Sequence, residues 1–136
     1  MKAFIILPLL LASAGAMADT PLRSLVYYTT AARQNQPDFN ADSMRGQSFA
    51  LRKWGVSQSL PSCATCHTDR PGNAGRHAIT GKPIAALSPA ASPERFSNPA
   101  KVEKWFKRNC NEVLGRACTP AEKADFIKFV MEDQAS

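Results

Sequence analysis

The stretch Cys63-Ala64-Thr65-Cys66-His67 (CATCH) decides how the rest of the chain is interpreted. Two cysteines separated by two residues and followed directly by a histidine form the C-x-x-C-H pattern, at which a c-type haem is attached. One helical turn separates the two thiols by the width of a porphyrin edge, where each thiol adds to a vinyl group. The next residue then lies under the ring, where its imidazole can reach the iron. The motif therefore predicts one covalently attached haem c, held by Cys63 and Cys66, with His67 as iron ligand.

Two other uses of a C-x-x-C pair compete with haem attachment. The pair also occurs in redox dithiols and as half of a zinc site. A dithiol enzyme would need a βαβ context that this sequence lacks, and a zinc site would need Cys110, Cys118 or His77 at unusual spacing. The adjacent histidine and the export signal described next both favour haem, because haem c is attached outside the cytoplasm.

The first 18 residues have the layout of a secretory signal peptide. A basic start at Lys2 is followed by an apolar run and then by the small residues Ala16-Met17-Ala18, the A-x-A pattern of a cleavage site. The apolar run covers residues 3–12, whereas a helix that spans a bilayer needs ~20 residues. We expect cleavage after Ala18, a single domain formed by residues 19–136, no membrane span after cleavage and a location in the periplasm of a Gram-negative bacterium.

The charge of the chain is positive but dispersed. The sequence contains 17 Lys and Arg and 11 Asp and Glu residues, so that loss of Lys2 with the signal leaves a net charge of +5. The basic residues extend from Arg23 to Lys128 without a long run, which argues against a nucleic-acid-binding protein. The positive charge of an exported protein is better explained by electrostatic steering toward an acidic protein partner.

Helix start signals and apolar spacing predict a small all-α domain of four or five short helices. The helices are expected at 20–34, 41–54, 98–108 and 119–132, the last with a Thr119–Glu122 capping box. Recurring prolines among Gly, Ala and Ser fill 70–98, which excludes a long helix or a central strand. Long segments of this kind are uncommon in small domains, so we expect an omega-type loop that wraps a bound group.

These motifs do not identify the residue that binds the iron from the face opposite His67. Electron-transfer cytochromes c usually place a methionine there. Met131 lies near the end of the last helix beside two acidic residues, and Met44 on the second helix is expected to fill the core. His77, in the proline-rich segment, could bind iron or could lie at the surface of the loop.

One helical stripe offers another candidate for the sixth ligand. Val102, Trp105, Phe106 and Asn109 follow the spacing i, i+3, i+4, i+7 and share one face of the helix that begins near residue 98. The aromatic rings suit contact with a flat haem, and Asn109 ends the same stripe. Asn109 is then either an iron ligand or a C-terminal helix cap.

From about Pro61 to Val130 the chain resembles the SHP family of small high-spin cytochromes c, which bind oxygen and other diatomic gases. The resemblance rests on CATCH together with TGKPIAALSP, VEKWFKRNCN and GRACTPAEKAD, which are specific in combination. It implies a class I-like cytochrome c fold wrapped around one covalent haem. It also implies that O2, NO or CO binds at the haem.

The resemblance further implies the roles of particular residues. His67 corresponds to the proximal ligand, and Asn109, not Asn111, corresponds to the asparagine whose side-chain oxygen is the sixth ligand in the ferric state and leaves on reduction. Cys110 and Cys118 correspond to a disulfide pair. Members of the family are associated with a dihaem cytochrome c as electron donor.

Two alternative functions remain. The first is an ordinary electron-transfer cytochrome c with a permanent sixth ligand from Met131, Met44 or His77. The second is an enzyme, such as an NO dioxygenase or a weak peroxidase, for which an open iron suffices chemically. The sequence shows no clear distal acid–base pair, although His77 or Arg76 could serve as one.

Overall fold

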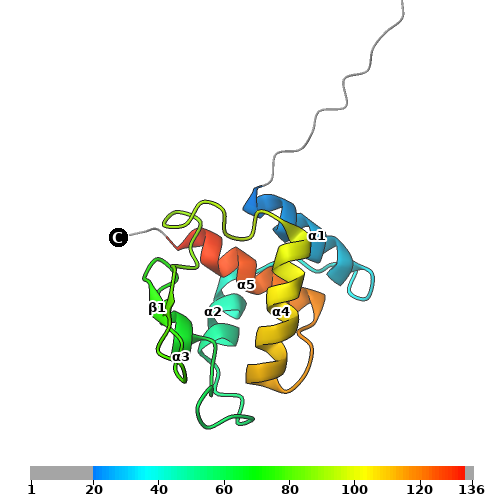
Figure 1. Cartoon of the computed structure of the whole chain (residues 1–136). Coiled ribbons are helices and arrows are strands. Elements are labelled where there is room, and N and C mark those ends of the chain that lie inside the picture. The colour runs from blue at the N-terminus through cyan, green and yellow to red at the C-terminus, as the bar shows by residue number, and fades with distance from the viewer. Residues whose placement is uncertain (1–19, 134–136) are drawn as a thin grey trace, which may run out of the picture.

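The structure is a computed structural model that describes residues 20–133, so the expected signal peptide lies outside the described residues. The elements, shown in Figure 1, are α1 (Pro21–Arg33), α2 (Ser43–Leu51), α3 (Ala64–His67), β1 (Gly75–Arg76), β2 (Pro83–Ile84), α4 (Pro99–Leu114) and α5 (Pro120–Glu132). The predicted all-α fold is confirmed. The sequence did not predict the short antiparallel pair β1–β2, in which Gly75 lies opposite Ile84. No helix within the described range has the length and apolar character that a bilayer crossing needs.

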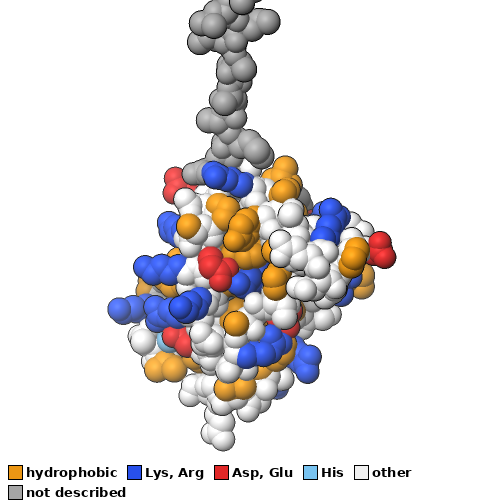
Figure 2. Space-filling model, turned by 90° about the vertical axis from the view of Figure 1, so that its right-hand side faces the viewer, with side chains coloured by type: hydrophobic (Ala, Val, Ile, Leu, Met, Phe, Trp, Pro, Cys, Tyr) orange, Lys and Arg blue, Asp and Glu red, His pale blue; other side chains and the backbone are white. Residues whose placement is uncertain are grey.

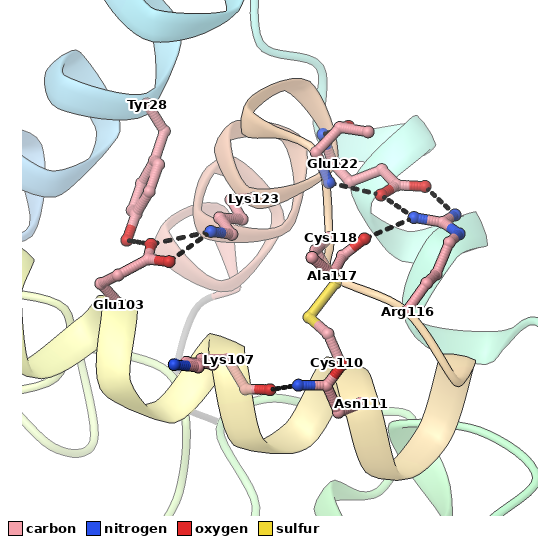
Figure 3. Close-up of a disulfide and its surroundings, with 11 residues drawn as sticks. Tyr28, Glu103, Lys107, Cys110, Asn111, Arg116, Ala117, Cys118, Glu122 and Lys123 are labelled. Carbon is pink, nitrogen blue, oxygen red and sulfur yellow. Dashed lines mark hydrogen bonds and ion pairs between the residues drawn. A yellow bond between two sulfur atoms is a disulfide. The ribbon is translucent and has the colours of Figure 1, made fainter.

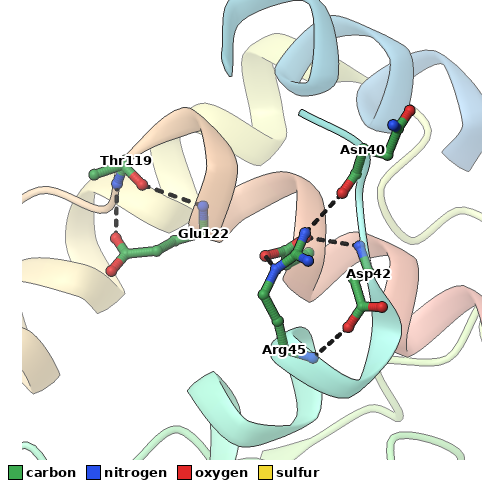
Figure 4. Close-up of polar contacts among 6 residues, drawn as sticks. Asn40, Asp42, Arg45, Thr119 and Glu122 are labelled. Carbon is green, nitrogen blue, oxygen red and sulfur yellow. Dashed lines mark hydrogen bonds and ion pairs between the residues drawn. The ribbon is translucent and has the colours of Figure 1, made fainter. Parts of the chain in front are cut away.

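Side-chain caps fix where the longer helices begin. Asn98 accepts a hydrogen bond from the Lys101 amide at 3.0 Å at the start of α4. At the start of α5, Thr119 and Glu122 cap each other's backbone amides in the predicted capping box (Figure 4). Such caps satisfy amides that have no partner within the helix. Thr20 occupies the cap position of α1 but makes no side-chain cap bond there.

The C-terminal end of α4 differs from the sequence prediction. The helix does not stop near residue 108 but continues to Leu114, where Gly115 adopts a left-handed conformation with φ of 69°. Glycine takes this conformation without the steric cost that a Cβ atom brings. Asn109 is therefore an interior residue of α4, and its interpretation as a helix cap is wrong.

The core lies where α2 crosses α5. Gly46 faces α5 so closely that a Cβ atom there would overlap the Asp125 carbonyl. Phe49 of α2 packs edge-on against Phe126 of α5, which also contacts Phe106 of α4. Ion pairing supports the crossing, because the Arg45 guanidinium donates to both oxygens of the buried Asp125 carboxylate at 2.8 and 2.9 Å.

A polar cluster joins α1, α4 and α5 (Figure 3). The hydroxyl of the buried Tyr28 donates to Glu103 at 2.8 Å, and the Nζ atom of Lys123 lies 2.7 Å from the same carboxylate oxygen. The side chain of Lys123 is only 10% exposed, and that of Glu103 is 49% exposed. Burial opposes ionisation of Glu103, but the hydrogen bonds from Lys123 and Tyr28 outweigh it and hold its pKa below the ordinary value.

This cluster predicts a pH dependence of stability. A carboxyl group whose pKa is lowered in the folded state stabilises the fold above its ordinary pKa of ~4.3, and it loses that contribution as the pH falls through the folded value. At pH 7 we expect Glu103→Gln to lower the unfolding free energy of the holoprotein by about 1–2 kcal/mol, because Lys123 stays buried without a counter-charge. The difference from wild type should shrink below about pH 4, as Glu103 becomes protonated in wild type as well.

Denaturant unfolding at several pH values measures this effect. Glu112→Gln on the same helix is the matched control, because the Arg108–Glu112 pair is exposed on both sides. Exposed pairs of this kind contribute about 0.2–1 kcal/mol at most. A Glu103→Gln penalty that stays constant from pH 7 to pH 3 would contradict the proposed ionic origin.

The segment between α3 and α4 is anchored rather than loose. The amides of Leu87 and Ser88 both donate to the Pro71 carbonyl, at 2.8 and 2.9 Å, which closes the loop on itself. The Ser88 hydroxyl then donates to the Asp133 carbonyl at 2.7 Å, and the Gly72 amide donates to the Asp133 carboxylate. Figure 1 shows the segment passing the C-terminal end of α5 on its way to α4.

Candidate haem site

The CATCH stretch forms a single helical turn. Cys63 is the N-cap of α3, and the His67 amide donates to the Cys63 carbonyl at 3.1 Å. Thr68 ends the turn with φ of 65°. The turn therefore presents Cys63, Cys66 and His67 in the order that haem attachment needs.

Both thiols are unpaired and half-buried. Burial raises the pKa of Cys63 to about 11, so that the thiol is neutral at physiological pH. A neutral thioether suits the same apolar surroundings. Among residues 20–133, no three His, Cys, Asp or Glu side chains gather as a metal-ion site. The zinc interpretation also loses two candidate ligands, because Cys110 and Cys118 are joined to each other.

The His67 imidazole has the properties that a haem ligand needs. Burial, followed by the positive charges of Arg95 and His77, lowers the pKa of His67 to about 4. The ring is therefore neutral near pH 7, which is the form that binds metals. Its Nδ1 atom is buried and has no hydrogen-bond partner within the described chain. Since buried polar atoms are nearly always satisfied, this orphaned ring fits a site that a group outside the chain, such as a haem, would complete.

The β1–β2 hairpin covers Cys66. A Cβ atom at Gly75 would overlap the Cys66 carbonyl, so only glycine permits this approach. The Ala78 amide donates to the Cys66 sulfur at 3.3 Å. The hairpin therefore encloses one of the two attachment points.

His77 has a structural role in this hairpin that the sequence did not reveal. Its Nδ1 atom accepts hydrogen bonds from the amides of Ile79 and Thr80 at 3.3 and 3.2 Å. Asparagine and aspartate commonly stabilise turns through the same pattern of acceptance from amides two residues on. Nδ1 is thus committed to the turn, which leaves only Nε2 for any other use.

The stripe on α4 divides between core and surface. Val102 and Phe106 are buried, and the Phe106 ring packs against Tyr28 and Phe126. Trp105 is 48% exposed and lies outside the buried core. Asn109 is half-buried, and its side chain makes no hydrogen bond within residues 20–133.

The residue after Asn109 is covalently fixed. Cys110 and Cys118 form a disulfide with 5.7 Å between their Cα atoms, and both are buried (Figure 3). The exposed Asn111 turns the other way, because its side-chain amide donates to the Lys107 carbonyl at 2.7 Å. The two asparagines of RNCN therefore have different surroundings.

The structure also places the two methionines. Met44 does not fill the core as expected, because its residue is 75% exposed. Met44 and Phe129 of α5 both line a shallow groove. Met131 is half-buried and packs against the core near the end of α5.

Comparisons with known proteins agree with this site. Residues 36–130 match a family model described as a domain of unknown function, DUF1924. The chain is 43% identical over 132 residues to cytochrome c-type protein SHP of Cereibacter sphaeroides, covering 96% of this chain and 98% of that protein. It is 41% identical over 125 residues to cytochrome c'' of Methylophilus methylotrophus, covering 89% and 87%.

Solved structures give the same result. The oxidised form of SHP, an oxygen-binding cytochrome c, superposes with a TM-score of 0.73 over 82% of this chain and 95% of that one, at 43% identity. Oxidised cytochrome c'' superposes with a TM-score of 0.76 over 84% and 94%, at 35% identity. The chain therefore belongs to the family of c-type cytochromes that includes SHP and cytochrome c'', and it is a monohaem cytochrome that carries haem c.

Proposed function

We propose that this cytochrome binds diatomic gases at a position that Asn109 occupies in the ferric state and leaves on reduction. The haem supplies the iron that changes redox state and binds the gas. The observation that carries the proposal is the half-buried Asn109, whose side chain makes no hydrogen bond within the described chain, next to the disulfide at Cys110. Its SHP relative is an oxygen-binding cytochrome c, and cytochrome c'' has been solved as a case of haem-ligand detachment.

The chemistry of an amide oxygen explains why reduction would release Asn109. The oxygen is a hard, neutral ligand that ferric iron tolerates, whereas ferrous iron is softer and less charged and holds it weakly. The ligand field of an amide is also weak, so we expect a high-spin iron. The redox state would then determine which form is populated: a ferric form with Asn109 bound to the iron, or a ferrous form with that position vacant.

The disulfide restricts how far Asn109, a weak ligand, can move. Because Cys110 is tied to Cys118, the turn of α4 that carries Asn109 is fixed to the segment before α5. A weak ligand binds usefully only when it is held at high effective concentration near its target. Restricting Asn109 in this way would keep it close enough to bind the iron again after each oxidation.

The alternative ligands have less support. Asn111 is exposed and bonded to Lys107, and Met44 is mostly exposed. His77 uses Nδ1 to stabilise its own turn. Asn109, by contrast, is half-buried and makes no side-chain hydrogen bond within the described chain.

We assign the electron donor to a dihaem cytochrome c with an acidic docking surface. The solvent face of α4 carries Lys101, Lys104, Lys107 and Arg108, all exposed. Figure 2, the view from the right-hand side of Figure 1, shows that Lys and Arg side chains predominate over acidic ones on that face of the molecule. Such a face would steer an acidic partner toward the protein and speed association at low ionic strength.

The proposed location is the periplasm, reached through a cleavable signal at residues 1–18 that leaves residues 19–136 as the mature domain. An oxidising compartment keeps the Cys110–Cys118 disulfide intact.

Addition of CO to the reduced protein tests the proposed gas binding. We expect the visible spectrum of the reduced holoprotein to change to that of a CO complex within the mixing time, and the ferric protein not to respond. An ordinary electron-transfer cytochrome with a permanent ligand would show no change on CO addition in either state. That outcome would end the gas-binding proposal.

A further inference from the structure

Arg95 is a partly buried cation whose charge is not balanced within the described chain. It lies in the loop before α4, where its Nε atom donates to the Ala86 carbonyl at 3.1 Å and its Nη2 atom donates to the Ala85 carbonyl at 2.9 Å. None of the carboxylates within residues 20–133 forms an ion pair with it. Burial lowers the pKa of Arg95, as expected for a guanidinium without a counter-charge.

It is unusual for a partly buried cation to have backbone carbonyls as partners and no carboxylate. Lys123, which is more deeply buried than Arg95, pairs with Glu103 at 2.7 Å. Removing a charge from water is unfavourable unless an opposite charge or good hydrogen bonds offset it. Two neutral carbonyls supply only part of that compensation.

Arg95 also lies near the haem-attachment turn. It bonds to Ala85 and Ala86, which directly follow β2, and β2 pairs with β1, whose Gly75 lies against the Cys66 carbonyl. The charge of Arg95 acts on the His67 imidazole, and the loop that carries Arg95 is the segment that follows the CATCH turn. A guanidinium has five N–H donors, and the two carbonyls use one on Nε and one on Nη2. The remaining donors, on Nη1 and Nη2, have the planar fork that carboxylates match.

We propose that Arg95 binds a propionate carboxylate of the haem, through the guanidinium N–H groups that the Ala85 and Ala86 carbonyls leave free. The carboxylate supplies the missing counter-charge, and the two carbonyls hold the guanidinium in place. The inference rests on the covalent haem c and is independent of whether Asn109 is a ligand.

Arg95 is then a positioning residue with an electrostatic effect on the iron. A positive charge near the haem favours the ferrous state over the ferric state, and an unpaired propionate does the opposite. Removing the guanidinium charge should therefore lower the reduction potential. A residue that only braced the loop would leave the potential and the propionate vibrations unchanged.

The test compares Arg95→Gln and Arg95→Lys with two controls in the holoprotein. Ser88→Ala loosens the same loop without changing charge, since it removes the Ser88–Asp133 hydrogen bond. Arg70→Gln removes an exposed charge from that loop. The readouts are the reduction potential and the haem propionate bending band in the resonance Raman spectrum.

We expect Arg95→Gln to shift the propionate band and to lower the potential. Arg95→Lys should keep the potential closer to wild type, because it retains the charge, and both controls should match wild type. An unchanged band and potential in Arg95→Gln would overturn the proposal. So would an equal loss of potential in Arg95→Gln and Arg95→Lys, or an equal shift in Ser88→Ala. If Arg95→Gln yields no holoprotein, the comparison of Arg95→Lys with Ser88→Ala decides, because only Arg95→Lys should shift the propionate band.

Discussion

Asn109→Ala should leave the ferric iron five-coordinate or water-bound and should speed cyanide binding to the ferric protein by about tenfold or more. Wild-type Asn109 must leave before cyanide can bind, and each ~1.4 kcal/mol of competition from a ligand corresponds to a factor of ten. The substitution removes the side-chain oxygen in the middle of α4 without disturbing a hydrogen bond within the described chain. Stopped-flow mixing of ferric protein with cyanide measures the rate, and the ferric visible spectrum reports the coordination.

Asn111→Ala is the matched control for this prediction. It removes the same side chain two residues away, on the same helix, where the amide bonds to the Lys107 carbonyl and is exposed. We expect its ferric spectrum and cyanide rate to equal those of wild type. If Asn109→Ala behaves like Asn111→Ala, Asn109 is not an iron ligand.

Replacing both Cys110 and Cys118 by alanine should have the largest effect on stability. The disulfide links residues eight positions apart, and the chain-entropy model assigns about 2–3 kcal/mol to closing a loop of this size. Alanine avoids placing a hydroxyl group in the buried positions of the two sulfurs. Denaturant unfolding of the holoprotein, followed by far-UV circular dichroism, measures the loss.

The same variant tests whether the disulfide restrains Asn109. If it does, cyanide binding to the ferric protein should be faster than in wild type, though slower than in Asn109→Ala. Arg108→Gln is the control, since it breaks an exposed ion pair on the same helix and should change stability by well under ~1 kcal/mol. A destabilised variant with the wild-type cyanide rate would show that the disulfide stabilises the fold without positioning Asn109.

Local sequence patterns predicted the features that depend on neighbouring residues. The CATCH turn, the Asn98 cap and the Thr119–Glu122 capping box each involve residues within one helical turn of each other. The end of α4 was missed because the polar run around Asn109 suggests a helix end. Nothing in that run stops the helix, and the left-handed conformation that ends it occurs at Gly115.

The phase of α2 explains why Met44 is exposed. Gly46 faces α5 because only glycine permits so close an approach to the Asp125 carbonyl. Phe49 and Ala50, three and four residues later, share that face and are buried. Met44 and Leu51 lie on the other side of the helix and face solvent. Apolar character alone did not reveal which side would face the core.

The role of Arg95 could not be predicted because it depends on how the long loop closes. The Arg95 donors reach carbonyls nine and ten residues earlier in the chain. The loop itself is fixed by the contact of Ser88 with Asp133, which are 45 residues apart. No short motif records contacts over such separations, so the orphaned charge of Arg95 became visible only in the folded structure.

Resonance Raman spectra of the wild-type protein in both redox states test the central claim most directly, because the marker bands of the porphyrin report spin state and coordination number. Departure of Asn109 on reduction predicts a six-coordinate, high-spin ferric iron and a five-coordinate, high-spin ferrous iron. A six-coordinate, low-spin ferrous spectrum would show a permanent sixth ligand and would contradict the account.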